Sequence, residues 1–228
     1  MVKKSINLAK RSFTSSYNRI VSEKNNLEDF NKYSKNIYTY TNKTKLSLAK
    51  LSIAYLNGDN DYMYDEMGNS DCVLTNVIKS DNEFTSYHYF NGDNSYGTFI
   101  SAPIGSGAVD FALSLWVYVP KEFNGSTHAR IISKEYCYYL GVYDNNLSVY
   151  IGNGSSWVDS SISMGKIGYD TWHHIVYVKN GTSFKTYIDS VEAGSITLSS
   201  TSVGTNANPV NIGKFSGGSQ YFFGNMAK

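Results

Sequence analysis

The chain has 228 residues, is 41% hydrophobic and 15% aromatic, and carries a net charge of only +1 at pH 7. This length accommodates one large β domain with an appendage, and the hydrophobic content suffices for a sizeable core. The longest apolar runs are only as long as a strand, which excludes a membrane-spanning helix. The basic N-terminus lacks an apolar segment, so no conventional secretory signal is expected.

Residues 1–48 differ from the rest of the chain. Ile6, Phe13, Ile20 and Leu27 recur every seven residues, which favours one or two amphipathic helices. Residues 1–50 hold 11 Lys and Arg against three acids, a net charge of +8, whereas residues 51–228 hold 9 against 16, a net charge of −7. We predict a basic helical arm, either packed on its own domain or anchoring the chain to a larger assembly or another copy. Charge alone also allows nucleic-acid binding, but no recognised motif supports it.

From residue 49 to residue 228 the pattern is that of β-strands. The clearest strand is 111–119, in which Phe111, Leu113, Leu115 and Val117 occupy alternate positions before Pro120 ends the run. Apolar groups also occupy its other face, which predicts a central strand. Further strands are predicted at 52–56, 72–78, 87–90, 96–102, 130–133, 138–143 and 147–151.

A hairpin over residues 172–188 forms the centre of the predicted fold. Two strand-like runs flank Asn180-Gly181, residues that tolerate the positive φ of a tight primed turn. Residues 153–163 are predicted to be a polar loop that carries Trp157, and strands follow at 194–198 and 210–212. Short strands spaced by roughly 8–12 residues predict an all-β, antiparallel two-sheet β-sandwich of the jelly-roll type, preceded by an N-terminal α-helical segment.

Cys72 and Cys137 are the only cysteines in the sequence, and no Cys or His lies near them to complete a zinc site. A disulfide requires a suitable approach of their Cα atoms, which the sequence does not define. A disulfide and two buried free thiols therefore both remain open.

Four segments in order carry a resemblance to a known family. Residues 55–69 look like an opening strand with an Asp-x-x-Gly-Asn loop, and residues 89–96 look like a Phe-Asp-Gly segment. Residues 110–117 look like a strand ending in Trp-Val, and residues 172–176 match a Trp-His-His-Val strand. Together they resemble the laminin-G-like, concanavalin A-like lectin/glucanase domains of bacterial and viral surface proteins. The resemblance implies a concanavalin A-like jelly roll over residues 49–228 but specifies no ligand.

Two features depart from the family pattern. Where some members hold calcium, this chain has Asn91, Asn94 and Ser95, which leaves Asp93 as the weak candidate metal ligand. A hard cation prefers several charged oxygens, so calcium binding is disfavoured and no cofactor is expected. Members also continue into a long last strand after the segment 223–226. We therefore expect a missing strand and an open C-terminal sheet edge, filled by a longer polypeptide or by another subunit.

The sequence offers no pattern for catalysis. Glucanases of this fold resemble one another in a Glu-x-Asp-x-x-Glu strand that sets two carboxylates on one face. Here Glu122, Glu135 and Glu192 are isolated. His173 and His174 are adjacent on a strand and so point to opposite faces, and no Ser or Cys nucleophile motif accompanies them. We predict no enzymatic activity and structural roles for both histidines.

Sugar binding needs an exposed aromatic platform with planar polar side chains nearby. The predicted ligand-binding residues are Trp157, Tyr96, Asp93, Asn94 and Tyr136. Trp157 leads this set because it lies in a polar loop, although it could also simply pack. Trp116 and Trp172 are predicted to belong to the core.

Two functions fit these observations. The first is a non-enzymatic recognition or adhesion module that binds glycan or another surface. The alternative is a structural virion protein, such as a fibre, decoration or minor capsid component, held to other subunits through residues 1–48 and the open C-terminal edge. Either role places the protein on a virion surface or another extracellular surface, with no specific nucleic-acid partner and no membrane span.

Overall fold

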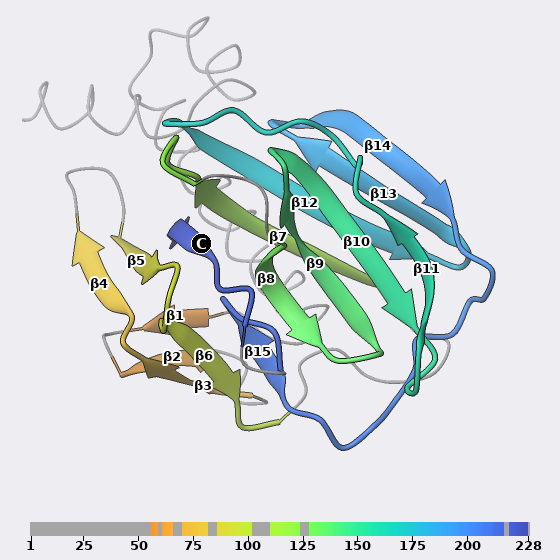
Figure 1. Cartoon of the computed structure of the whole chain (residues 1–228), viewed down its shortest axis with the longest axis horizontal. Coiled ribbons are helices and arrows are strands. Elements are labelled where there is room, and N and C mark those ends of the chain that lie inside the picture. The colour runs from red at the N-terminus through yellow and green to blue at the C-terminus, as the bar shows by residue number, and fades with distance from the viewer. Residues whose placement is uncertain are drawn as a thin grey trace, which may run out of the picture. The chain divides into compact units, whose positions relative to one another are not determined.

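The computed structural model describes residues 56–58, 61–65, 70–81, 86–101, 110–123, 128–216 and 219–227. These residues form strands joined by turns and loops, and none of them is α-helical (Figure 1). The predicted all-β fold class is therefore confirmed for this part of the chain. None of its residues belongs to a helix that could span a membrane. The helical arm predicted for residues 1–48 lies outside the described residues and stays a prediction.

The described strands form one sheet of nine and one of seven, and every neighbouring pair is antiparallel. In spatial order the nine-stranded sheet consists of β1 (Leu56–Gly58), β2 (Tyr62–Asp65), β3 (Cys72–Thr75), β6 (Tyr96–Phe99), β15 (Val210–Ile212), β8 (Ala129–Lys134), β9 (Tyr138–Tyr143), β10 (Asn146–Gly152) and β11 (Trp157–Ser161). The seven-stranded sheet consists of β14 (Val191–Thr197), β13 (Ser183–Ile188), β12 (Trp172–Asn180), β7 (Phe111–Tyr118), β16 (Phe223–Ala227), β5 (Ser86–Asn91) and β4 (Ile78–Asp81). Figure 1 shows β8, β9 and β10 lying over β7 and β12, as in a two-layer sandwich.

The strand β7 lies at the centre of the seven-stranded sheet, as its sequence predicted. Its register with β12 places Leu115 opposite Ile175 and Leu113 opposite Tyr177. Opposite residues share a face of the sheet, and these four side chains enter or line the hydrophobic core. Aromatic and β-branched residues favour such a pleated, half-buried surface.

The hairpin β12–β13 turns one residue later than the sequence predicted. Asn180 pairs with Ser183 at the end of the ladder, which leaves Gly181 and Thr182 as the two loop residues. Of these two, Gly181 takes a positive φ of 56°. Positive φ at the first loop position matches a type II′ turn, which glycine occupies without strain. The hairpin itself is confirmed.

A hydrogen bond crosses the core between the two sheets. Tyr177 on β12 is fully buried, and its hydroxyl donates a 2.9 Å hydrogen bond to the carbonyl oxygen of Gly141 on β9. A buried hydroxyl without a partner would destabilise the core, so this bond fixes how the sheets stack. Burial raises the pKa of Tyr177 well above its ordinary value. The phenol therefore stays protonated and remains a donor.

Cys72 on β3 and Cys137 in the β8–β9 turn are both buried, and both are free thiols. The structure thus takes the free-thiol alternative. Burial raises the pKa of Cys72 to about 12, so this thiol is protonated at neutral pH. A protonated, buried thiol is a poor nucleophile, and it serves here as a small apolar side chain.

The C-terminal strand β16 does not form an open sheet edge as expected, whereas the missing strand beyond it is not tested by the structure and stays a prediction. The strand β16 lies between β5 and β7 and pairs with both of them. The edges of the seven-stranded sheet are instead β4 and β14. In β16, Met226 enters the core while Phe223 and Asn225 are half-buried. Five residues that include a glycine give too short an alternation to identify a strand from sequence.

Replacing Tyr177 by Phe removes the hydroxyl but keeps the ring. We expect the free energy of unfolding to fall by about 1–2 kcal/mol, because a buried hydrogen bond between the sheets is lost. Denaturant unfolding measures this change. Tyr187→Phe on β13, where the side chain is half-buried, is the matched control. An unchanged unfolding midpoint for Tyr177→Phe, or an equal loss in the control, contradicts the prediction.

Candidate functional site

One row of residues crosses the nine-stranded sheet on its outward face. The register places Thr98, Asn211, Ser133, Tyr139 and Tyr150 opposite one another in turn. Opposite residues share a face, while their neighbours along each strand point into the core. Thr98 Oγ1 donates a 2.9 Å hydrogen bond to Asn211 Oδ1. The rings of Tyr139 and Tyr150 stack with their centroids 5.2 Å apart. We call this set the outward row.

Three aromatic rings meet at the β11 end of the outward row. The ring centroid of Trp157 lies 5.7 Å from that of Tyr150 and 5.8 Å from that of Tyr136. Tyr136 is 36% exposed, and the other two side chains are half-buried. We call these three residues the aromatic cluster. The structure thus brings together Trp157 and Tyr136, which the sequence singled out separately, and adds Tyr150.

Backbone geometry fixes the segments that carry the aromatic cluster. Trp157 begins the edge strand β11 instead of lying in a loop as predicted. The Ser-rich composition suggested a loop, but pairing with β10 makes the segment a strand. Tyr136 occupies the β8–β9 turn with a φ of 56°, and its carbonyl oxygen accepts a 2.8 Å hydrogen bond from the N–H of Gly154. A Cβ at Gly152 would lie 2.1 Å from that same oxygen, so this position requires glycine.

Planar polar side chains lie beside the aromatic cluster. Asn206 Nδ2 donates to the carbonyl oxygens of Glu135 (2.7 Å) and Gly154 (3.1 Å). Asn208 Nδ2 donates to the carboxylate of Glu135 at 3.4 Å. Glu135 directly precedes Tyr136, and the N–H of Gly154 bonds the carbonyl oxygen of Tyr136, so these half-buried groups hold the backbone that carries the cluster. Aromatic surface flanked by a few placed polar groups is typical of small-molecule binding sites.

A buried cation lies over the middle of the outward row. The Cζ atom of Arg130 is 3.4 Å from the ring centroid of Tyr139 and 4.8 Å from that of Phe215, which is a cation–π arrangement. Gln220 Oε1 accepts hydrogen bonds from Nε (2.9 Å) and Nη2 of the guanidinium. Arg130 is 6% exposed. Burial lowers its pKa to about 10, so it remains a cation at neutral pH.

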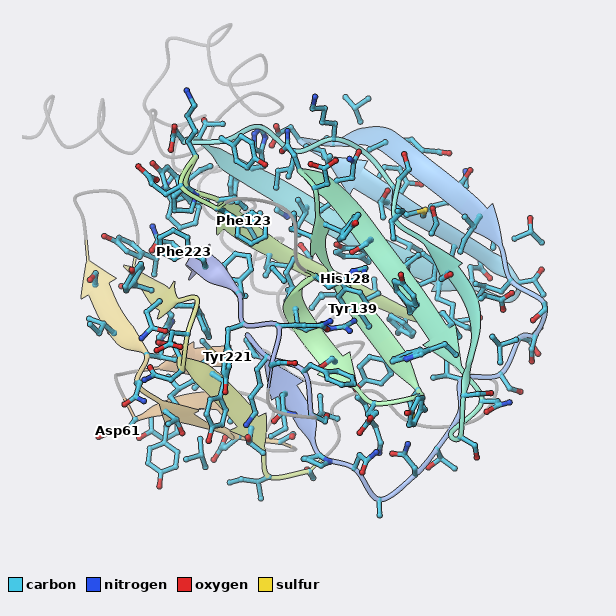
Figure 2. The ribbon with its side chains drawn as sticks, viewed as in Figure 1. Asp61, Phe123, His128, Tyr139, Tyr221 and Phe223 are labelled. Atoms are coloured by element: carbon cyan, nitrogen blue, oxygen red, sulfur yellow. The ribbon has the colours of Figure 1, made fainter. Side chains whose placement is uncertain are left out.

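His128 lies beside Tyr139, as Figure 2 shows. Its ring stacks on that of Tyr143, with centroids 4.4 Å apart, and meets the ring of Tyr150 edge-on at 5.6 Å. Burial, with the charge of Arg130, lowers the pKa of His128 below its ordinary value of 6.5. The imidazole is therefore neutral at physiological pH and acts as one more aromatic member of this face.

Tyr96 lies on the same outward face, at its β6 end. Lys214 Nζ is 3.3 Å from the ring centroid of Tyr96, and the ring of Tyr221 is 6.4 Å away. A hydrogen bond with Thr75 and the charge of Lys214 lower the pKa of Tyr96. Five strand spacings separate β6 from β11, about 24 Å in all. Tyr96 therefore does not belong to the aromatic cluster.

Asp93 and Asn94 serve the turn between β5 and β6. Asn91 Oδ1 accepts hydrogen bonds from the N–H groups of Asp93 (3.0 Å), Asn94 (3.0 Å) and Ser95 (3.1 Å). Asn91 Nδ2 donates to Asn94 Oδ1 at 2.8 Å. The Asn91 side chain thus caps this turn, and its hydrogen bonds explain why the loop is rich in polar residues. Across the described ranges, no group of three or more His, Cys, Asp or Glu side chains could hold a metal ion.

Trp116, predicted to be a core residue, is 42% exposed on the outward face of the seven-stranded sheet. Its ring lies 5.2 Å from that of His174, whose Nε2 is 2.8 Å from Ser114 Oγ. Trp172 is half-buried against Tyr118, with ring centroids 5.8 Å apart. The strand β7 has apolar residues on both faces, so its sequence did not reveal which face points outward.

Several of the histidines and glutamates considered for catalysis make structural contacts. His173 Nδ1 lies 2.7 Å from Asp189 Oδ2, and its Nε2 accepts from the N–H of Gly168 at 3.2 Å. The Nδ1 contact thus closes the open end of the β12–β13 hairpin, and the Nε2 contact holds the loop that precedes β12. Glu192 pairs with a lysine on β13 at 2.8 Å, whereas Glu135 belongs to the other sheet. The described side chains of His173, Glu192 and Glu135 therefore do not converge on one site.

Sequence reasoning did not single out the central residues on the outward face of the nine-stranded sheet: His128, Arg130, Tyr139, Tyr150 and Phe215. The alternation of Tyr139, Gly141 and Tyr143 along one strand is the signal that could have marked an outward aromatic row. The contact of Arg130 with Phe215 and Gln220 joins segments far apart in the chain. No local sequence pattern predicts this contact.

Comparison with known proteins gives the family and the fold. Residues 90–228 match the family described as the concanavalin A-like lectin/glucanases superfamily, which confirms the resemblance. Domain 4 of AbnA, a GH43 extracellular arabinanase from Geobacillus stearothermophilus, solved in complex with arabinotriose, is similar at a TM-score of 0.55 and 21% identity, over 77% of this chain and 87% of that chain. The binding domain of botulinum neurotoxin serotype D/C is similar at a TM-score of 0.56 and 15% identity, over 78% and 46%.

A further botulinum structure, the binding domain of neurotoxin DC in complex with rat synaptotagmin II, gives a TM-score of 0.56 at 16% identity, over 78% of this chain and 46% of that chain. This chain therefore spans about half the length of the neurotoxin structures that it resembles. Identities of this size show a shared fold. The sequence matches no curated protein.

Replacing His128 by Gln tests the burial of this histidine through the pH dependence of the protein's stability. Because the folded pKa of His128 lies below 6.5, the unfolded chain binds more protons just below that pH, and stability falls as pH decreases through this window. We expect the wild-type protein to lose stability more steeply than His128→Gln between about pH 7 and about pH 5, measured by denaturant unfolding. An NMR titration should place the midpoint of His128 below 6.5. Parallel stability profiles or a midpoint above 6.5 contradict the prediction.

Proposed function

The chain belongs to the concanavalin A-like lectin/glucanase superfamily, and we propose that it is a non-enzymatic recognition module that binds glycan through the aromatic cluster. The observation that carries this proposal is the convergence of three partly exposed rings from a turn and two strands. The glycan belongs to a cell, virion or other extracellular surface. The arabinotriose complex of domain 4 of AbnA supports this class of ligand on this fold.

The chemistry of the cluster suits a sugar. A sugar ring presents C–H groups on its faces and hydroxyl groups around its edge. The flat rings of Tyr136, Tyr150 and Trp157 cover the C–H face, and side-chain amide groups such as that of Asn208 bond the hydroxyls. Tyr and Trp lose little side-chain entropy on binding. Their fixed backbone positions lower the cost further.

The carboxylates near the cluster support binding without hydrolysis. Retaining and inverting glycosidases place two carboxyl groups on either side of the scissile bond. Here Glu135 accepts from Asn208, and Asp159 Oδ2 on β11 accepts from both the N–H (3.0 Å) and the hydroxyl (2.9 Å) of Ser199. Both carboxylates are therefore engaged in holding loops.

Replacing Trp157 by Ala should weaken glycan binding by about thirtyfold or more, because a central Trp of a binding surface contributes about 2 kcal/mol. A glycan array identifies the ligand, and calorimetry on the best ligand measures the change. Trp116→Ala on the opposite sheet is the matched control and should leave the affinity unchanged. Retained affinity in Trp157→Ala, or an equal loss in both variants, sinks the proposal. Circular dichroism verifies that each variant folds.

The second candidate is a structural role in a larger assembly, for example as a fibre, decoration or minor capsid component of a virion. The opposite charges of the two parts of the sequence favour it: +8 over residues 1–50 and −7 over residues 51–228. A basic arm of one copy is complementary to the acidic remainder of another.

Light scattering tests the assembly role. We expect the intact chain to form multimers that dissociate as salt rises, because exposed charges are screened beyond about 10 Å at 0.1 M ionic strength. A protein trimmed to residues 50–228, with its fold verified by circular dichroism, should remain a monomer throughout. Monomers of both forms at low salt count against assembly through residues 1–48.

A further inference from the structure

Arg130 is a buried cation that lacks a carboxylate partner in the described part of the chain. Ion pairs in that part include those of His173 with Asp189, Lys179 with Asp110 and Lys185 with Glu192, and none of these includes Arg130. The guanidinium is instead stacked against rings, and its Nη1 atom meets no hydrogen-bond acceptor among the described residues. An unpaired charge inside a protein is costly unless another group compensates it.

The acceptor that faces Arg130 is neutral. Gln220 Oε1 alone receives hydrogen bonds from both Nε and Nη2. A guanidinium carries five donors in a rigid fork that fits a carboxylate or another oxyanion with two parallel bonds. Charge-assisted bonds of this kind are stronger than those to an amide oxygen. A ligand oxyanion that takes the place of the Gln220 amide oxygen therefore gains energy at this position.

Gln220 is placed so that it can yield to a ligand. Its side chain is half-buried, unlike that of Arg130, and so reaches solvent. Its φ is 62°, a left-handed conformation that non-glycine residues rarely adopt. The backbone carbonyl oxygen of Gln220 holds the N–H of Arg130 at 3.3 Å, so the main chain keeps its position when the side chain moves.

A chain of ring contacts links Arg130 to the aromatic cluster. Lys214 places a second cation on the same face, over Tyr96. Arg130 touches Tyr139, which stacks on Tyr150, which in turn contacts Trp157. From β8 to β11 there are three strand spacings, about 14 Å. Tyr139 is itself fully buried, but this span is short enough for an oligosaccharide on the partly exposed rings of the cluster to reach the guanidinium once the Gln220 side chain moves aside.

We propose that Arg130 binds the acid group of an acidic glycan, a sugar carboxylate or sulfate, in exchange for the amide oxygen of Gln220. This inference rests on the proposed function, because the aromatic cluster holds the sugars that carry the acid group. It adds the class of ligand: a polysaccharide bearing negative charge, bound by both a ring platform and a cation.

The decisive variant is Gln220→Glu, which supplies a carboxylate from the protein at nearly the same volume. We expect it to raise stability in denaturant unfolding and to abolish the preference for acidic ligands. Ser219→Glu adds the same charge at the exposed neighbouring position and should do neither. The probes are a glycan array and two polysaccharide pairs: polygalacturonate with its methyl ester, and dextran sulfate with dextran.

Wild-type protein should bind the charged member of at least one pair about tenfold more tightly than the neutral member. The carboxylate pair and the sulfate pair identify which oxyanion is recognised. Equal affinity within both pairs, a preference retained in Gln220→Glu, or a preference lost equally in Ser219→Glu overturns the inference. If binding in these cases still depends on Trp157, the proposed function stands. If Trp157→Ala changes no binding at all, or no glycan binds, the proposed function fails as well.

Discussion

A single five-residue strand holds the seven-stranded sheet together. The strand β16 is bonded to β5 on one side and to β7 on the other, so β4 and β5 connect to the rest of their sheet through it. Its approach is fixed by Phe222, which is fully buried, packs against Phe90 at 6.1 Å, and donates its N–H to the carbonyl oxygen of Gly213 at 2.8 Å. The segment that enters the seven-stranded sheet as β16 is thereby anchored to Gly213, which follows β15 of the nine-stranded sheet.

That anchoring links the fold to the candidate site. The residues between Gly213 and Phe222 include Lys214, Phe215 and Gln220, whose side chains lie on the outward face of the nine-stranded sheet. The strand β15 is only three residues long, so it pairs with β8 from Ile132 onward and leaves the start of β8 to this connection. The backbone of Gln220 then takes the place of a neighbouring strand for Arg130. The connection from β15 to β16 thus leads into the central part of the seven-stranded sheet and also covers Arg130 on the nine-stranded sheet.

The sequence predicted much of the fold because its signals are local. Alternation over 111–119 and the Asn-Gly hairpin depend on residues close together in the chain, and both appear in the structure. The site depends on strand order, which a sequence does not state. Tyr136 and Trp157 meet because the β8–β9 turn and the edge strand β11 both adjoin β10. The exposure of Trp116 and the burial of Arg130 likewise follow from which sheet faces which, and single-strand patterns do not contain that information.

The left-handed turn at Tyr136 has a kinetic consequence. Under the proposed function, the backbone that carries the Tyr136 ring needs no rearrangement when a partner arrives, so association is expected at the rate for rigid surfaces, about 10⁵–10⁷ M⁻¹s⁻¹. Differences in affinity between partners then arise from how quickly each one leaves. Under the proposed function, a partner held by three rings at the rim of a sheet dissociates rapidly, and lasting attachment requires several copies to bind one surface at the same time.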